Sequence, residues 1–136
     1  MKKILFVLVA LFPLLTNAQE VSTPPEKYDG KVYKESKLDT KPEFPGGIAA
    51  FYKCVNTNFR IPEIEGGGNF VIPVSFIIEI DGSMSNFEIL KDPGFQMGKE
   101  AIRVLSKVEK KWSSGIKKNK AVRSLYTFSI TINIKA

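Results

Sequence analysis

NFVIPVSFIIEIDGSMSNFEIL, residues 69–90, contains two strand patterns and a turn between them. Apolar side chains occupy every second position from Phe70 to Ile80, which predicts a strand over residues 69–81 with one buried face. Asp81-Gly82 follows, and both residues tolerate the positive φ angles of a tight hairpin turn. The sequence therefore predicts a hairpin whose return strand covers residues 84–90.

Helical patterns lie on both sides of this hairpin. The first begins after the turn-rich segment PEFPGG, residues 42–47, and has apolar residues spaced by three, four and seven at Ile48, Phe51, Tyr52, Val55 and Phe59. Pro62 and the three glycines at 66–68 end it, because proline cannot continue a helix and glycine loosens the backbone. The second helix is expected over residues 97–110, with Ala101, Ile102, Leu105 and Val108 along one side.

The last pattern is a long strand over residues 121–134. Its apolar side chains share one parity from Val122 to Ile134, and the other parity is mostly polar. The element order is then helix, strand, strand, helix, strand, with one apolar sheet face for both helices to cover. These features predict a two-layer α+β domain.

Length and composition fit a single small domain. The chain has 136 residues, of which 43% are hydrophobic and 25% are charged. It contains no histidine, so mechanisms that need an imidazole base or an imidazole metal ligand are excluded. Its one cysteine, Cys54, can form neither an internal disulfide nor a multi-thiolate metal site.

The amino-terminal residues predict export. Residues 1–18 combine Lys2 and Lys3 with a short apolar run and a small residue, Ala18, which is typical of a signal peptide cleaved after that position. A retained inner-membrane anchor is the alternative, but the run is shorter than the ~20 apolar residues of a membrane-spanning helix. Residues 19–41 are polar and are expected to be a flexible lead-in to a domain at 42–136. The expected location is the periplasm.

Positive charge is concentrated near the carboxyl terminus. Residues 103–136 hold 9 basic side chains and one acidic side chain, whereas residues 19–102 hold 9 basic and 13 acidic ones. The basic patch is predicted to comprise Lys107, Lys110, Lys111, Lys117, Lys118, Lys120 and Arg123. It suits peptidoglycan or another anionic polymer by Coulomb attraction, and the alternative is an ordinary solvated surface. Export disfavours nucleic acid as the partner.

Several motifs together resemble the carboxyl-terminal domain of TonB-like energy transducers of the Bacteroidetes type. They are Phe-Pro-Gly-Gly at 44–47, the strand that runs into Asp81-Gly82, Glu100-Ala101 on the second helix, Trp112 followed by Gly115, and the long final strand. They occur in the family's order over residues 42–135. The resemblance implies two helices packed on one face of a three-stranded antiparallel sheet, with the last strand at its edge.

In TonB proteins that edge binds the TonB box, an extended segment of an outer-membrane receptor, as an added strand. An edge strand presents unpaired N–H and C=O groups that an extended peptide can complete. Transferred to this sequence, the docking edge runs from Val122 to Ile132. The predicted peptide-binding residues are Val122, Arg123, Ser124, Leu125, Tyr126, Thr127, Phe128, Ser129 and Ile130. The same edge allows a homodimer through the last strand.

Other chemistry-bearing residues have structural interpretations. Glu79 and Asp81 point the same way on a strand, which fits either paired catalytic carboxylates or a solvated face ending in a turn. Trp112 is expected to cap the core, and Cys54 to be a partly buried small side chain. The glycines at 66–68 lack the Lys-Ser/Thr and the helix of a phosphate loop. No catalytic residue, metal site or cofactor is predicted.

The sequence thus favours a non-enzymatic binding module of the cell envelope that captures an extended, TonB-box-like peptide, associated with TonB-dependent transport. Attachment to an anionic polymer is the second hypothesis. A small hydrolase or isomerase using Glu79, Asp81 or Cys54 is the third, although no pocket is evident in the sequence.

Overall fold

A computed structural model describes residues 30–136 of the chain. The expected signal peptide at 1–18 and the first part of the lead-in lie outside these residues. The elements in chain order are β1 (Val32–Lys34), the 3₁₀ helix η1 (Glu35–Lys37), α1 (Ile48–Asn58), β2 (Gly68–Ile78), β3 (Met84–Ile89), α2 (Met97–Ser106), β4 (Gly115–Lys117) and β5 (Lys120–Ile134).

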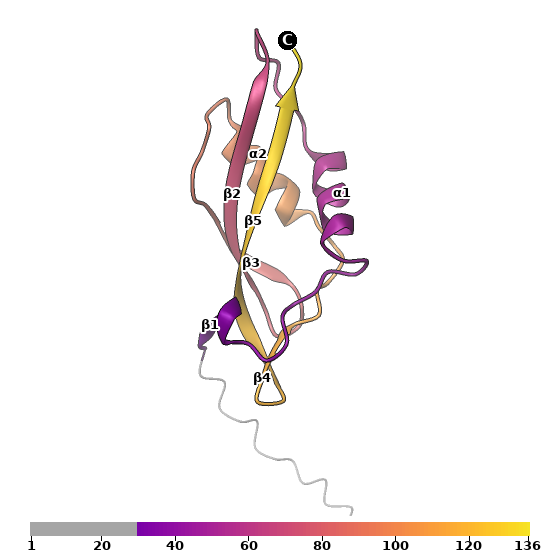
Figure 1. The fold of residues 1–136 in the computed structure, drawn as a ribbon, viewed down its shortest axis with the longest axis vertical. Helices are drawn as coiled ribbons and strands as arrows, with labels where there is room; N and C mark the ends of the chain where they lie inside the picture. The colour runs from indigo at the N-terminus through magenta and orange to yellow at the C-terminus, as the bar shows by residue number, and fades with distance from the viewer. Residues whose placement is uncertain (1–29) are drawn as a thin grey trace, which may run out of the picture.

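The strands form one curled sheet in the order β1-β5-β2-β3, and β4 also pairs with β5 (Figure 1). Strands β2 and β5 run antiparallel in one continuous register from Gly68–Ile134 to Ile78–Ser124. β3 completes the expected hairpin with β2. The α+β class, the two helices and the three expected strands are therefore confirmed.

The expectation of three antiparallel strands is wrong in its detail. The described sheet has five strands, and β1 runs parallel to β5. β1 arises from residues expected to be a flexible lead-in, where Val32 and Tyr33 supply too short a pattern to recognise. β4 forms a tight hairpin with β5 through Lys118 and Asn119, both at positive φ (51° and 63°). Lysine in such a turn gives no recognisable sequence signal.

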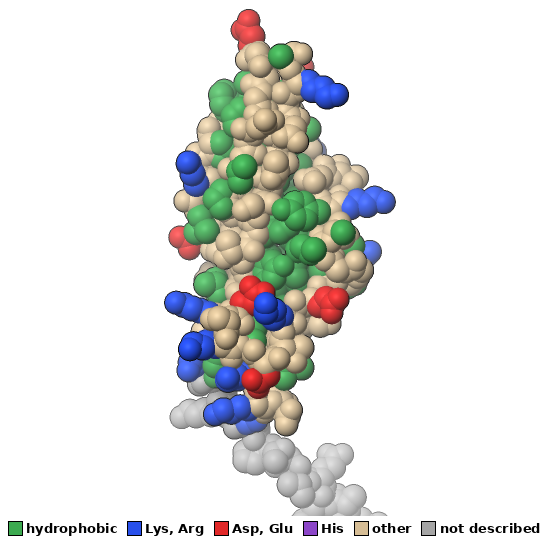
Figure 2. All heavy atoms as spheres, viewed as in Figure 1, with side chains coloured by type: hydrophobic (Ala, Val, Ile, Leu, Met, Phe, Trp, Pro, Cys, Tyr) green, Lys and Arg blue, Asp and Glu red, His purple; other side chains and the backbone are tan. Residues whose placement is uncertain are grey.

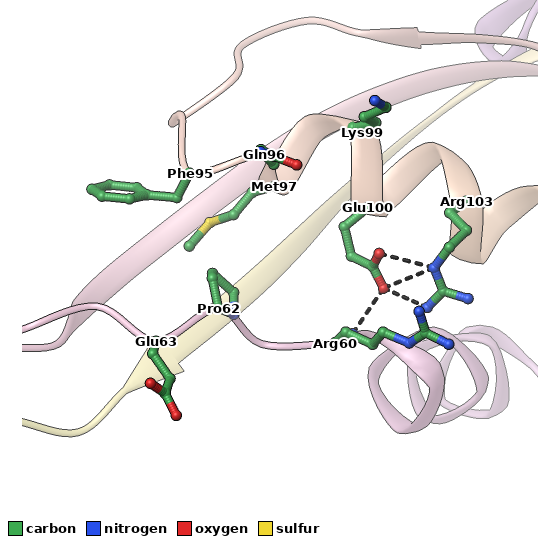
Figure 3. A pocket seen from close by; sticks show the side chains of 9 residues that line it. All are labelled: Arg60, Pro62, Glu63, Phe95, Gln96, Met97, Lys99, Glu100 and Arg103. Atoms are coloured by element: carbon green, nitrogen blue, oxygen red, sulfur yellow. Dashed lines mark hydrogen bonds and ion pairs between the residues drawn. The ribbon is translucent and has the colours of Figure 1, made fainter.

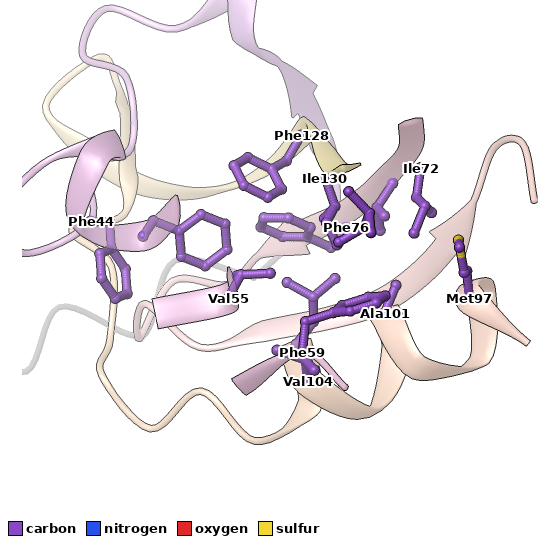
Figure 4. Packing of buried hydrophobic residues seen from close by; sticks show 14 of the residues in the cluster. Phe44, Val55, Phe59, Ile72, Phe76, Met97, Ala101, Val104, Phe128 and Ile130 are labelled. Carbon is purple, nitrogen blue, oxygen red and sulfur yellow. The ribbon is translucent and has the colours of Figure 1, made fainter. Parts of the chain in front are cut away.

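The core lies between the helices and the sheet face that carries the even-numbered side chains of β2 and β5 (Figure 4). Phe51 and Val55 of α1 and Leu105 of α2 are fully buried against it. The strand residues of β2 and β5 in this core are Ile72, Val74, Phe76, Ile78, Phe128, Ile130 and Ile132. The predicted periodicity is thus confirmed for these residues of both helices and both long strands, but Ile102, which was expected on the buried side of α2, is 37% exposed.

The Phe-Pro-Gly-Gly turn places an aromatic ring in this core. The Phe44 side chain is 2% exposed, and its ring lies 5.0 Å from that of Phe51 and 5.3 Å from that of Trp112. Gly46 and Gly47 follow with φ angles of 88° and 86°, which only glycine adopts readily. A Cβ on Gly46 would also lie 2.9 Å from the Ala50 Cβ. These glycines let the chain reverse directly into α1.

An ion pair on α2 ties the end of α1 to α2. Arg103 donates from Nε to both carboxylate oxygens of Glu100 at 3.0 and 2.9 Å, and from Nη2 to the Asn58 carbonyl at 2.9 Å. The Arg60 N–H donates to Glu100 Oε1 at 2.9 Å. Hydrogen bonds from Arg103, and then from the Arg60 backbone, lower the pKa of Glu100 below its ordinary value of 4.5. Glu100 therefore remains a carboxylate at neutral pH.

Candidate functional site: the edge of the last strand

The two flanks of β5 differ along its length. One flank pairs with β2 from Ser124 to Ile134, and with β4 from Lys120 to Val122. The other flank pairs with β1 only, over Arg123 to Leu125. Within residues 30–136, no strand continues β1 along that flank past Leu125. β5 is therefore an inner strand at its start and an edge strand over most of its length.

The direction of the backbone groups follows from a proline in β2. The Pro73 carbonyl accepts from the Leu90 N–H at 2.8 Å, so the backbone groups of Pro73 face away from β5. Ser129 of β5 lies opposite Pro73 in the register of the two strands. Pro73 and Ser129 therefore form a pair without hydrogen bonds between them. Backbone direction alternates along a strand, so Thr127, Ser129, Thr131 and Asn133 direct N–H and C=O away from β2. We call this stretch, residues 127–133 on the side away from β2, the free flank.

Helix α1 borders the free flank. The Tyr52 hydroxyl donates to the Ser129 carbonyl at 2.8 Å, and the Tyr52 ring lies 4.6 Å from that of Phe128. Ile48, one turn earlier, is 45% exposed. Figure 2 shows apolar side chains gathered between β5 and α1. A strand added here would have polar side chains next to it on one face of the sheet. On the face covered by α1 it would have apolar side chains next to it.

The residues of the sequence-predicted edge lie in three different surroundings. Val122 pairs with β4 on the flank that β2 also uses, and Arg123, Ser124 and Leu125 lie where β1 already occupies the other flank. These four residues are therefore not part of an open edge. Tyr126, Phe128 and Ile130 direct their backbone groups toward β2, and their side chains toward the core. Only Thr127 and Ser129 of the predicted set present backbone groups on the free flank. Asn133 and Tyr52 were not predicted, because the direction of the β5 backbone groups and the position of α1 beside β5 depend on the neighbouring elements.

Arg123 has an internal role rather than an exposed one. Its Nε and Nη2 donate to the two carboxylate oxygens of Glu79 at 2.8 and 2.9 Å, and its Nη1 donates to the Gly30 carbonyl at 3.0 Å. The Arg123 and Glu79 side chains are only 22% and 24% exposed. This pair joins β5 to the end of β2 and to the chain entering β1. It therefore helps to close the flank of β5 at that end.

The remaining members of the predicted basic patch are divided among separate elements. Lys107, Lys110 and Lys111 follow α2, whereas Lys117, Lys118 and Lys120 belong to the β4–β5 hairpin. Lys111 lies 3.8 Å from an Asp81 oxygen, and Lys117 lies 3.9 Å from an Asp39 oxygen. Figure 2 shows acidic side chains between the lysines and arginines at this end of the molecule. These acidic neighbours weaken the attraction for an anionic polymer.

Other candidate residues have ordinary contacts. Besides its bond with Arg123, Glu79 accepts from the Ser85 hydroxyl at 2.6 Å, and Asp81 accepts from the Ser83 N–H at 2.9 Å. The Ser83 hydroxyl and backbone lower the pKa of Asp81 below 3.8. Cys54 is a free, half-buried thiol. In residues 30–136, no three potential metal-ligating side chains of Cys, Asp or Glu lie together.

Comparisons with known proteins leave the family open. No family model, curated protein or solved structure matches the chain. Among the described residues, no helix has both the length and the apolar composition needed to cross a membrane. The geometry of the free flank is therefore the main ground for a functional proposal.

Proposed function

We propose that the protein is an exported, TonB-like binding module of the cell envelope that captures an extended peptide by adding it as a strand to the free flank of β5. The observation that carries this proposal is the composition of residues 124–134, which contain no charge, proline or glycine. The register of these residues with β2 is also free of bulges. Soluble proteins rarely leave such an edge unprotected unless it binds another chain.

The opposite edge of the same sheet gives an internal comparison. β3 has only six residues, and its register with β2 shifts between Ser75 and Ile77. Asn86 within it has a φ of 56°, and Glu88 is charged and exposed. Short length, bulges and charge are the usual means by which proteins prevent pairing at an edge. One edge is thus protected against strand addition and the other is not.

The free flank also indicates the chemistry of the peptide. Its backbone must be extended and free of proline at the positions that donate to Thr127 and Thr131. Side chains on the helix face would lie near Ile48 and Tyr52, which favours apolar residues there. The Ser129 carbonyl already accepts from Tyr52, but a carbonyl oxygen has two lone pairs and can accept a second donor.

The partner class that fits is an envelope protein with an exposed TonB-box-like segment, such as a TonB-dependent outer-membrane receptor. The location implied is the periplasm, as the amino-terminal sequence predicts. Polymer attachment through the lysines has less support, because Lys111, Lys117 and Arg123 each have an acidic neighbour. A second copy of the chain is the competing occupant of the free flank.

Disulfide cross-linking tests the proposal. Thr131→Cys would be made in a Cys54→Ser background and mixed with synthetic peptides copying the periplasmic amino-terminal segments of receptors from the same genome. Each peptide carries one cysteine at successive positions. Strand addition predicts cross-links at alternate peptide positions, because a disulfide needs Cα atoms within about 7 Å and a shared face.

Glu88→Cys on β3 is the matched control, since it is equally exposed but lies on the protected edge. It should form no periodic cross-links. Equal reaction at both edges, or reaction at Thr131→Cys without alternation, would contradict the proposal. Cross-linked protein dimers that persist in excess peptide would assign the free flank to a second copy instead.

A further inference from the structure

A hollow away from the free flank lies between the segment that leaves α1 and the start of α2. Its volume is about 670 Å³, and it is lined by Arg60, Pro62, Glu63, Phe95, Gln96, Met97, Lys99, Glu100 and Arg103 (Figure 3). This size lies within the range of ~300–1,000 Å³ that is usual for small-molecule sites. Neither the expected strand addition nor the basic patch involves these residues.

One end of the hollow is apolar. Phe95, Pro62 and Met97 lie together at this end in Figure 3. The Phe95 side chain is 57% exposed, although its ring contacts Phe70 edge-on at a centroid distance of 5.8 Å. Phe95 and Gln96 both have positive φ angles, 57° and 62°. Such a conformation costs about 1 kcal/mol or more for each residue other than glycine, and it often marks functional positions.

The other end has an excess of hydrogen-bond donors. Glu100 is the acceptor there, but its oxygens already accept from Arg103 and from the Arg60 N–H. Among residues 30–136, no hydrogen-bond acceptor is bonded to the Arg60 guanidinium, whose charge is also attracted to Glu100. The Glu63 carboxylate points away from Arg60 in Figure 3. A ligand that contacts this end must therefore bring its own acceptors.

We propose that the hollow binds a carboxylate attached to an apolar body, with the carboxylate at Arg60 and the body against Phe95 and Pro62. Guanidinium groups pair with carboxylates through two parallel hydrogen bonds. The neighbouring apolar surface explains why an amphiphilic acid fits better than a bare anion. Two sources have this chemistry, namely a free acyl carboxylate and the carboxyl terminus of an apolar peptide.

Octanoate is the probe for the test, with binding followed by the amide chemical shifts of the ¹⁵N-labelled protein. Saturable binding with a dissociation constant of about 1 mM or tighter is expected for a ligand of this size. Shifts should be confined to the residues around the hollow. Octanamide, which lacks the charge, and inorganic phosphate, which lacks the apolar body, should each bind at least about tenfold more weakly.

Two variants test the polar end and the apolar end of the hollow separately. Arg60→Gln removes the guanidinium charge, and Phe95→Asn removes the ring but suits a left-handed backbone. Each should weaken octanoate binding about five- to tenfold. Lys53→Gln, an equal charge change on the exposed side of α1, should leave binding unchanged. Circular dichroism establishes that each variant is folded.

A peptide ending in Gly-Gly-Phe and its carboxamide distinguish the two sources. Tighter binding of the acid peptide than of octanoate assigns the site to a peptide terminus, and weaker binding assigns it to a free acid. The proposal is overturned if octanoate causes no saturable shifts, if phosphate binds equally well, or if folded Arg60→Gln binds octanoate as the native protein does.

Discussion

Thr127→Pro should leave the protein folded and lower its affinity for a receptor-derived peptide by at least about 30-fold, which corresponds to roughly 2 kcal/mol. The Thr127 N–H faces the free flank, so proline removes no hydrogen bond to β2. It does remove one donor for the added strand, worth about 1 kcal/mol, and it places ring carbons where the peptide backbone would lie. Isothermal titration calorimetry measures the change.

Thr127→Val is the matched control for this substitution. It removes the same hydroxyl but keeps the backbone N–H, so it should bind the peptide within about twofold of the native protein. Equal loss in both variants would show that the side chain, rather than the backbone, makes the contact. Native affinity in a folded Thr127→Pro protein would contradict strand addition on this flank.

Trp112→Ala should lower the free energy of unfolding by about 3–5 kcal/mol. The Trp112 side chain is 4% exposed, and its ring lies 4.9 Å from those of both Phe51 and Tyr126. It therefore links α1 to β5 through the aromatic cluster. Small domains have a total stability of about 5–15 kcal/mol, so this loss would unfold much of the population on modest heating. Urea denaturation followed by circular dichroism measures it.

Trp112→Phe is the control that shows whether the lower free energy of unfolding comes from lost side-chain volume. The indole Nε1 is buried and has no hydrogen-bond partner among the described residues, so phenylalanine removes volume without breaking a hydrogen bond. A loss of about 1–2 kcal/mol is expected for the smaller ring. If Trp112→Ala lost less than about 1.5 kcal/mol, Trp112 would not be the core residue that its burial indicates.

The long elements were predictable because each repeats one physical pattern many times. Even-numbered apolar positions continue through β2 and β5, and the spacing of Phe51 and Val55 indicates a helix face. The boundaries were less predictable. α2 ends at Ser106 rather than near residue 110, and β2 ends at Ile78, which leaves Ile80 42% exposed.

The site was only partly predictable because its limits depend on contacts between distant segments. β1 closes the flank of β5 at Arg123 to Leu125, and it consists of three residues from a polar region. The Tyr52 hydroxyl reaches Ser129 across 77 residues of sequence. Which β5 amides face outward depends on Pro73 and its register with Ser129. None of these pairings leaves a periodic signal in the chain.

Amide hydrogen exchange along β5 tests the central claim most directly. In the free protein the Thr127, Thr131 and Asn133 amides should exchange at least about 100-fold faster than those of Phe128, Ile130 and Ile132, which bond to β2. A receptor-derived peptide should slow the first group at least about tenfold and leave the second unchanged. If the peptide binds without slowing the outward amides, or if those amides are already protected in the free protein, the free flank is not where the peptide is captured.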